Sequence, residues 1–131
     1  HINKEKYIKV INTHLQSSDF ERFDKNAILQ LKELIDYMNM LNYNNIPYIV
    51  GGDFNIDITD FNNISNIKDV YYPNEPTIYI NFLTSYTSNK VKKDYDSLIF
   101  DYFISKIDME KPLVIPIDYS DHNPIKTHFF L

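Results

Sequence analysis

Two polar side chains, those of Asp53 and Asn55, follow the apolar run Tyr48–Val50 and a pair of glycines, Gly51 and Gly52. The chain has no other glycine, so we expect this pair to turn the backbone tightly after a short buried strand. If extended backbone continues beyond the pair, Asp53 and Asn55 point to the same side. A carboxylate beside a carboxamide suits a hard cation, a phosphate or an activated water; the alternative is an ordinary polar turn.

Four further residues that can bind a metal or move a proton are predicted to lie at strand ends: His14, Asp101, Asp121 and His122. Asp101 interrupts an apolar run, and a buried carboxylate is costly without a partner, so we expect a histidine, a backbone group or a hydroxyl beside it. Taken alone, His14 also fits an ordinary hydrogen-bonded histidine, and Asp121-His122 a simple turn. Because open α/β sheets place ligand sites at strand ends, the whole set suits metal-assisted hydrolysis of a phosphate ester.

The other histidines and nearby acids are not expected to take part in chemistry. His1 is terminal and His128 lies in a terminal strand, so both are interpreted as structural. Asp57, Asp60 and Asp69 are interpreted as surface or helix-capping acids.

The first half of the chain predicts a strand, a helix and a second strand. The strands are Tyr7–Asn12 and Tyr48–Val50, and the helix runs from Asp24 to Leu41. Its apolar positions recur at steps of three and four residues: Ile28, Leu31, Leu34, Ile35, Met38 and Leu41. This order is typical of a βαβ unit with parallel strands.

The second half predicts short strands in antiparallel order. Residues 58–75 are rich in turn formers, with a short helix expected near Ile64–Asp69, and Asn89–Asp94 reads as a solvated loop. The expected strands are Thr77–Phe82, Ser97–Ile104, Val114–Ile117 and Ile125–Phe130. The fold class is therefore α/β with a mixed, partly antiparallel sheet.

The composition of the chain argues for a globular protein and against several kinds of site. The 131 residues fit one domain, and an apolar fraction of 44% indicates a globular chain. Without cysteine the chain has no disulfides, thiolate zinc sites or thiol nucleophiles. A net charge of -5 and a single arginine, Arg22, argue against broad nucleic-acid binding. The chain begins at His1 without a signal-like segment, and we expect it to be a fragment of a longer protein.

Four motifs resemble, in order, those of the endonuclease/exonuclease/phosphatase superfamily, which has the DNase I-like fold. They are Thr13-His14-Leu15-Gln16, Gly51-Gly52-Asp53-Phe54-Asn55, Phe100-Asp101-Tyr102-Phe103-Ile104 and Ser120-Asp121-His122-Asn123-Pro124-Ile125. Within the superfamily the chain is most similar to neutral sphingomyelinases of bacterial type, through Thr13–Gln16, Gln30–Leu34, the doubled glycine and Asp118–His122. The resemblance implies an α+β four-layer sandwich.

The resemblance also implies a role for each motif residue. His122 would be the general base that activates water, and Asp101 would orient it. Asp53 and Asn55 would position water and phosphate, and His14 would donate to the phosphoryl oxygens or the leaving group. The implied ligands of Mg²⁺, or of another divalent cation, are Asp53, Asn55, Asp121 and His122.

The resemblance covers about the C-terminal half of the family's domain, so residues 1–131 are expected to form a single partial domain. The other half of the family's domain carries an Asn and a Glu that hold the main Mg²⁺. The full-length protein is expected to be a Mg²⁺-dependent phosphodiesterase that hydrolyses sphingomyelin, or a related choline phospholipid, to ceramide and phosphocholine, while this chain alone is expected to be inactive. A peripheral membrane partner and a secreted or membrane-associated location are implied. The alternatives are a nucleic-acid phosphodiesterase, such as an abasic-site endonuclease or a DNase, and an inactive truncated member that acts as a binding module.

Overall fold

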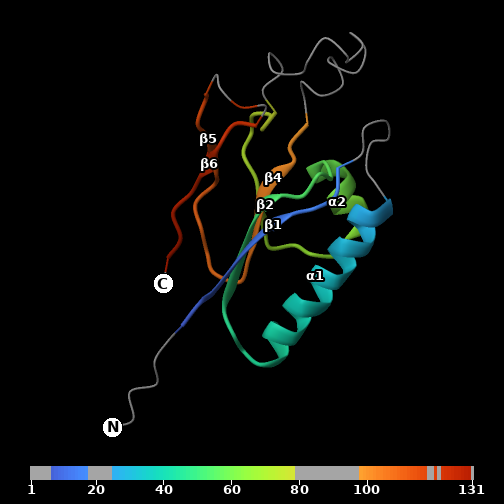
Figure 1. Cartoon of the computed structure of the whole chain (residues 1–131). Helices are drawn as coiled ribbons and strands as arrows, with labels where there is room; N and C mark the ends of the chain where they lie inside the picture. The colour runs from blue at the N-terminus through green and yellow to red at the C-terminus, as the bar shows by residue number, and fades with distance from the viewer. Residues whose placement is uncertain (1–6, 18–24, 79–97, 118–119, 121, 131) are drawn as a thin grey trace.

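The protein is built around a four-stranded mixed sheet with the strand order β1-β2-β4-β3 (Figure 1). The computed structural model describes residues 7–17, 25–78, 98–117, 120 and 122–130. The sheet strands are β1 (Lys9–His14), β2 (Tyr48–Asp53), β3 (Val70–Tyr71) and β4 (Asp101–Ser105). A second sheet pairs β5 (Leu113–Val114) with β6 (Ile125–Lys126), and the helices are α1 (Lys25–Tyr43) and α2 (Ile58–Ile64).

The predicted βαβ unit is present. Strand β1 pairs with β2 in parallel, with Val10 opposite Ile49, and α1 connects the two strands. The helix buries Ala27, Leu31, Met38 and Leu41, which recur at the spacing of an amphipathic helix. Just beyond its end, Asn45 has a φ of 53°, and the amide of Ile46 donates to the carbonyl of Leu41. An asparagine in the left-handed region is a common helix stop, which explains why α1 ends at Tyr43.

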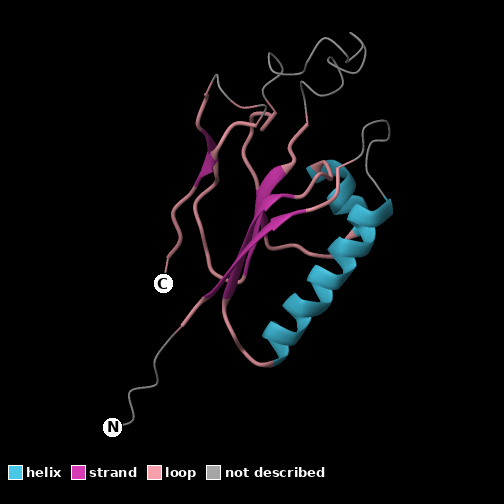
Figure 2. Ribbon diagram, in the orientation of Figure 1, coloured by secondary structure: helices cyan, strands magenta, loops and turns pink. Residues whose placement is uncertain are grey.

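The sheet has a layer on each face (Figure 2). On one face α1 and α2 cover Val50, Tyr102 and Ile104 of the central strands, and this side forms the larger apolar cluster. On the other face Ile49 packs with Ile107 and Met109 in a smaller cluster. In the part of the chain that the structure describes, no helix is both long enough and apolar enough to span a membrane.

The prediction that Gly51 and Gly52 turn the backbone is wrong, because both lie inside β2. They are required by close approach. A Cβ on Gly52, whose φ is 143°, would lie 2.0 Å from the carbonyl oxygen of Thr13, and a Cβ on Gly51 would lie 2.6 Å from the ring of Phe103. The turn comes later, at Asn55, which has a φ of 48°. Extended backbone therefore does not continue to Asn55, and the expected shared direction of its side chain and that of Asp53 is not set by strand geometry.

The second half of the chain is antiparallel as predicted, but its elements differ from the prediction. Strand β4 pairs antiparallel with both β2 and β3. The short helix covers Ile58–Ile64, not Ile64–Asp69, because Asp57 caps it and accepts a hydrogen bond from the amide of Thr59. Residues 66–69 follow the helix as irregular chain, and β3 was not predicted.

Of the four strands predicted in the second half, three are shorter than predicted, and the fourth lies mostly outside the described residues. Strand β4 begins at Asp101, since residues 98–100 are irregular. Of the predicted strand Thr77–Phe82, residues 79–82 lie outside the described residues, as does the predicted loop Asn89–Asp94, and Ile78 forms only an isolated bridge to His122. The two terminal strands are reduced to the two-residue pairs of β5 and β6.

Candidate active site

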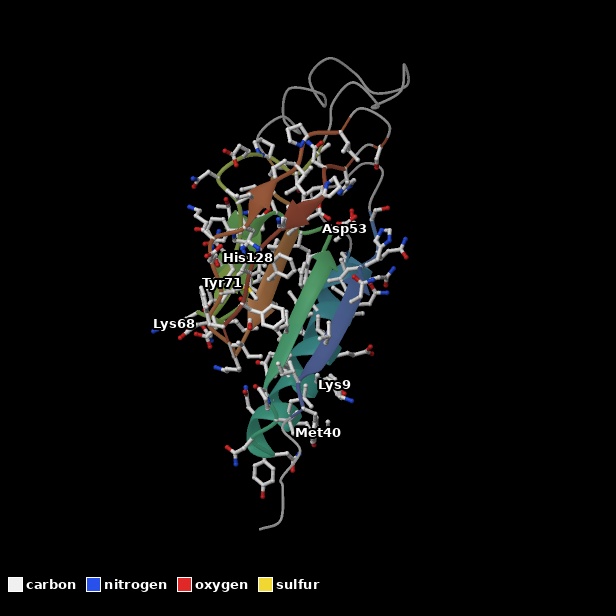
Figure 3. The ribbon with its side chains drawn as sticks, turned by 90° about the vertical axis from the view of Figure 1, so that its left-hand side faces the viewer. Lys9, Met40, Asp53, Lys68, Tyr71 and His128 are labelled. Carbon is white, nitrogen blue, oxygen red and sulfur yellow. The ribbon has the colours of Figure 1, made fainter. Side chains whose placement is uncertain are left out.

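The register of the main sheet brings three of the predicted site residues to one edge. His14 ends β1 and lies opposite Asp53, which ends the parallel strand β2. Asp53 in turn lies opposite Asp101, which begins the antiparallel strand β4. Figure 3 shows Asp53 at the carboxyl end of β2, far from Lys9 at the start of β1. Strand pairing alone therefore places an imidazole and two carboxylates side by side.

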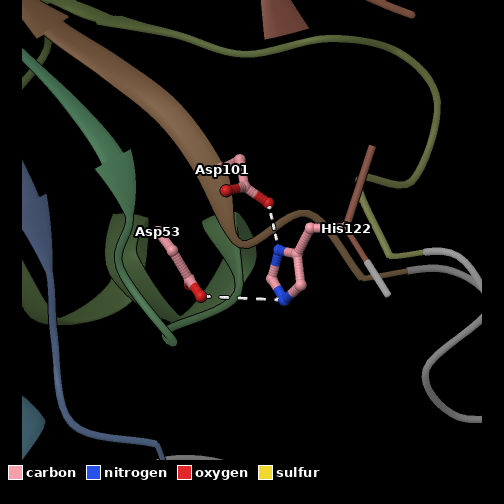
Figure 4. Close-up of side chains that lie close together, drawn as sticks. All are labelled: Asp53, Asp101 and His122. Carbon is pink, nitrogen blue, oxygen red and sulfur yellow. Dashed lines mark hydrogen bonds and ion pairs between the residues drawn. The ribbon is translucent and has the colours of Figure 1, made fainter. Parts of the chain in front are cut away.

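His122 joins this edge from the C-terminal part of the chain. Its Nδ1 atom lies 2.7 Å from Oδ2 of Asp101, and its Nε2 atom lies 3.6 Å from Oδ2 of Asp53 (Figure 4). The imidazole is thus held between two carboxylates, with 28% of its side chain exposed. The predicted partner of Asp101, whose side chain is 15% exposed, is therefore found, and it is the histidine. The carboxylate of Asp101 accepts hydrogen bonds, which favours the tautomer with the proton on Nδ1; in a neutral imidazole this tautomer leaves Nε2 unprotonated.

Asp53 is the central carboxylate of the group. Its Oδ2 atom lies 3.5 Å from Nε2 of His14 and 3.6 Å from Nε2 of His122. Burial raises the pKa of Asp53, and the nearby Asp101 raises it further, while the amide of Asn55 and the two histidines lower it. Burial is the largest of these effects, so the net pKa is above the ordinary value. A partly desolvated carboxylate of this kind favours a cation or a proton beside it.

Asn55 lies beside this group but faces partly away from it. Its backbone amide donates to Oδ1 of Asp53 at 2.8 Å, and its Nδ2 donates to the carbonyl of Leu15 at 2.8 Å. The side-chain amide therefore joins the turn after β2 to the segment after β1. Its Oδ1 atom is the one by which it could bind a cation.

Asp57 is the site residue whose role the sequence did not indicate. It was interpreted as a surface or capping acid; it does cap α2, but it is only 3% exposed. Its Oδ1 atom also accepts from the amide of Ile99 at 2.9 Å, and the amide of Ile58 donates back to the carbonyl of Ile99. These bonds tie the turn that follows Asp53 to the segment that leads into Asp101. An aspartate before a helix signals a cap, but nothing in the sequence signals the second bond.

Packed aromatic side chains support the site. The rings of Phe54 and Tyr102 stack with their centroids 4.1 Å apart, and Phe61 meets both rings edge-on. The hydroxyl of Tyr102 donates to the carbonyl of Ile56, and burial together with the neighbouring acids raises the pKa of this phenol far above its ordinary value. Tyr102 therefore stays protonated and acts as a support, not as an acid or a base.

Asp53, Asp101 and His122 form a possible metal site. One ligand atom from each lies within 4.8 Å of the others. Asp53 and His122 were predicted as ligands, whereas Asp101 was predicted only to orient His122; Asp121, also a predicted ligand, lies outside the described residues. Mg²⁺ typically takes one or two protein carboxylates and completes its shell with water and phosphate oxygens. These three side chains could supply part of such a shell.

His128 and Asp69, which were not expected to take part in chemistry, have partners outside this group. Nδ1 of His128 lies 2.8 Å from Oε2 of Glu110 at an exposed position, which agrees with its structural interpretation. Asp69 pairs with Lys106, and Asp60 lies in the first turn of α2. His1 lies outside the described residues.

No family model and no curated protein matches the chain, but its fold is similar to that of solved structures, among them a phosphatase and a toxin. A mannosyl-6-phosphatase of Bacteroides thetaiotaomicron VPI-5482 superposes with a TM-score of 0.51 and 16% identity, over 93% of this chain and 51% of its own. A beta toxin of Staphylococcus aureus, in a structure with bound magnesium ions, gives a TM-score of 0.53 and 23% identity, over 91% of this chain and 52% of its own. The chain spans about half the length of these structures, and its fold is DNase I-like, as predicted.

Proposed function

We propose that this chain carries the general-base half of a divalent-metal-dependent phosphodiester hydrolase. The observation that supports it best is the position of His122, which lies against Asp101 through Nδ1 and faces Asp53 through Nε2. An imidazole fixed in one tautomer by a carboxylate is the arrangement expected of a base that takes a proton from water. The likeness to two solved structures supports the fold on which such a site would be built.

In this proposal His122 removes a proton from the attacking water at Nε2. Oxygen of the water forms a bond to phosphorus while the bond between phosphorus and the leaving oxygen breaks. Asp101 holds the imidazole in place and stabilises the imidazolium that forms, because its carboxylate lies 2.7 Å from Nδ1. The leaving oxygen then takes up a proton, and His14, with its side chain 74% exposed at the same edge, is the proposed donor.

The cation would be held by Asp53, with Asn55 and Asp121 as further proposed ligands; His122, although predicted as a ligand, would have no nitrogen left for the cation, because Nδ1 faces Asp101 and Nε2 takes the proton of the water. When bound it would offset the negative charge of the phosphate. Asn55 would also position water and phosphate, because its side chain is fixed by the bond to Leu15. The carboxylate of Asp53, partly desolvated and next to two imidazoles, is the group best placed to hold positive charge.

We further propose that residues 1–131 are a single partial domain, the C-terminal part of an endonuclease/exonuclease/phosphatase domain, and that the full-length protein is the active form. The four motifs in family order support this, as does the coverage of about half of each matched structure. The proposed substrate is sphingomyelin or a related choline phospholipid, hydrolysed at a membrane surface by a peripheral, secreted or membrane-associated enzyme. The acidic net charge of -5 favours this choice over a nucleic-acid substrate.

The test is an assay of the full-length protein on vesicles of phosphatidylcholine with sphingomyelin, and separately on a duplex with one abasic site. We expect phosphocholine release that requires added Mg²⁺ and stops with a chelator, while the duplex stays intact. Cleavage of the duplex without phosphocholine release would replace the lipid substrate with nucleic acid. Inactivity on both, with the protein folded and Mg²⁺ present, would favour a binding module.

A further inference from the structure

Thr77 is a buried threonine whose hydroxyl contacts the start of β4. The residue is 0% exposed, and its Oγ1 atom accepts from the amide of Phe100 at 3.0 Å and from the amide of Asp101 at 3.2 Å. Its own amide donates to the carbonyl of Leu98. Three bonds from one residue therefore fix the backbone at the point where Asp101 enters the sheet.

The same residue also holds the segment that carries His122. The carbonyl of Thr77 accepts from the amide of Asn123 at 2.7 Å, and the adjacent Ile78 forms an antiparallel bridge with His122. Asn123 is itself fixed, because its Oδ1 atom accepts from the amide of Ile117. The backbone of His122 is thus bound to the short stretch Thr77–Ile78 on one side.

Asp101 and His122 come from segments that share no regular strand pairing in the described part of the chain. Strand β4 pairs with β2 and β3, and β6 pairs with β5. Thr77 contacts both segments, through its hydroxyl on one side and its carbonyl on the other. The distance of 2.7 Å between Nδ1 of His122 and Oδ2 of Asp101 therefore depends on the position of Thr77.

We propose that Thr77 is a positioning residue that sets the Asp101–His122 pair through its hydroxyl and carbonyl. The catalytic consequence rests on the function proposed above, whereas the geometric one does not. Thr77 touches none of the reacting atoms. It acts by holding the carboxylate and the imidazole at hydrogen-bond distance, and a displacement of about 1 Å in such a group can slow a reaction about 100-fold.

The test compares Thr77→Val with Thr77→Ser in the full-length protein. Valine keeps the shape but leaves the amides of Phe100 and Asp101 without their acceptor, whereas serine keeps the hydroxyl and loses only a methyl. The first readout is the low-field proton resonance of His122 Nδ1–H, assigned by its loss in His122→Ala. The second is kcat and KM for phosphocholine release from sphingomyelin vesicles with Mg²⁺.

We expect Thr77→Val to weaken or lose the resonance and to lower kcat about 10- to 100-fold with KM unchanged, and Thr77→Ser to keep both. A folded Thr77→Val protein with the resonance intact would overturn the proposal, as would equal losses in both variants, which would indicate packing alone. If Thr77→Val does not fold, Thr77→Cys replaces it, since a thiol is only a weak acceptor. A wild-type protein that neither releases phosphocholine nor cleaves the abasic duplex would refute the proposed function, and the resonance would still decide the positioning role.

Discussion

Asp53 and Asp101 lie opposite each other on β2 and β4, one at the end of its strand and the other at the beginning of its own. In a parallel pair the carboxyl ends of the two strands lie together, whereas this antiparallel pair places the carboxyl end of β2 beside the amino end of β4. The turn after Asp53 and the segment before Asp101 therefore meet at one edge, where His122 lies between the two carboxylates. Four predictions follow from this geometry and from the packing beneath it.

Replacing His122 by alanine should abolish most activity of the full-length protein. Loss of a general base typically slows a reaction about 100- to 10,000-fold, and we expect kcat for phosphocholine release to fall by that amount. The matched control is His128→Ala, since His128 also lies beside a carboxylate but at an exposed position away from the site. An active His122→Ala enzyme, or equal losses in the two variants, would refute the general-base role.

Replacing Asp53 by asparagine should separate stability from activity. Burial raises the pKa of Asp53, so its ionised form costs folding free energy at any pH above that raised pKa. Asparagine removes the charge and still accepts from the amide of Asn55. We therefore expect a higher or unchanged melting temperature at pH 7, with kcat about 10- to 100-fold lower.

The sign of this effect can be checked by pH. As the pH falls through the folded-state pKa of Asp53, the folded carboxyl takes up its proton and the stability cost begins to shrink, and it is gone below the ordinary pKa of 3.8, where the unfolded chain is protonated too. The difference in melting temperature between Asp53→Asn and wild type should then shrink toward zero on acidification. A difference that grows on acidification would mean that ionised Asp53 stabilises the fold, contrary to this account.

Replacing Asp57 by alanine should destabilise the protein markedly. The change leaves the amides of Thr59 and Ile99 without acceptors inside the fold, and we expect a loss of about 2–4 kcal/mol in the free energy of unfolding. Asp69→Ala is the control, because the Asp69–Lys106 pair is 44% exposed on both sides and should change stability by about 0–1 kcal/mol. Urea unfolding of both variants measures the difference, and similar values for the two would contradict a stabilising role of the two hydrogen bonds of Asp57.

Replacing Gly52 by alanine should be among the most damaging single-methyl changes in the chain. The new Cβ would lie 2.0 Å from the carbonyl oxygen of Thr13 at a φ of 143°, which L residues rarely adopt. We expect a loss of about 2–5 kcal/mol and disrupted pairing of β1 with β2. Gly51→Ala meets the ring of Phe103, a side chain that can shift, and should cost less, about 1–3 kcal/mol. Equal stabilities for wild type and Gly52→Ala would show that the carbonyl of Thr13 does not exclude a side chain at position 52.

The sequence predicted the parts of the fold that depend on local periodicity. The apolar spacing from Ile28 to Leu41 specifies α1, and the β-branched runs before His14 and Asp53 specify β1 and β2. The cost of burying an unpaired carboxylate predicted that Asp101 has a partner, but left open a histidine, a backbone group or a hydroxyl; the family resemblance pointed to His122, and Asp101 does lie against it. Local pattern was sufficient for the helix and the two strands, and elementary energetics for the need of a partner.

The sequence did not predict the features that depend on contacts between distant segments. Gly51 and Gly52 look like turn residues, but the space they leave is filled by Thr13 and Phe103 from the two neighbouring strands. The second hydrogen bond of Asp57, to Ile99, joins residues 42 positions apart, and no local sequence pattern indicates it. The short helix was misplaced because its start depends on the cap at Asp57, not on a periodic apolar face.

The bonds that assemble the site connect residues far apart along the chain. The separation is 21 positions between His122 and Asp101, 40 between Asn55 and Leu15, and 42 between Ile99 and Asp57. Closing such loops costs chain entropy that only the packed sheet and its apolar clusters can offset. The site should therefore form late in folding, together with the whole sheet. On denaturation, the imidazole–carboxylate contact and the tertiary structure should disappear in one cooperative transition.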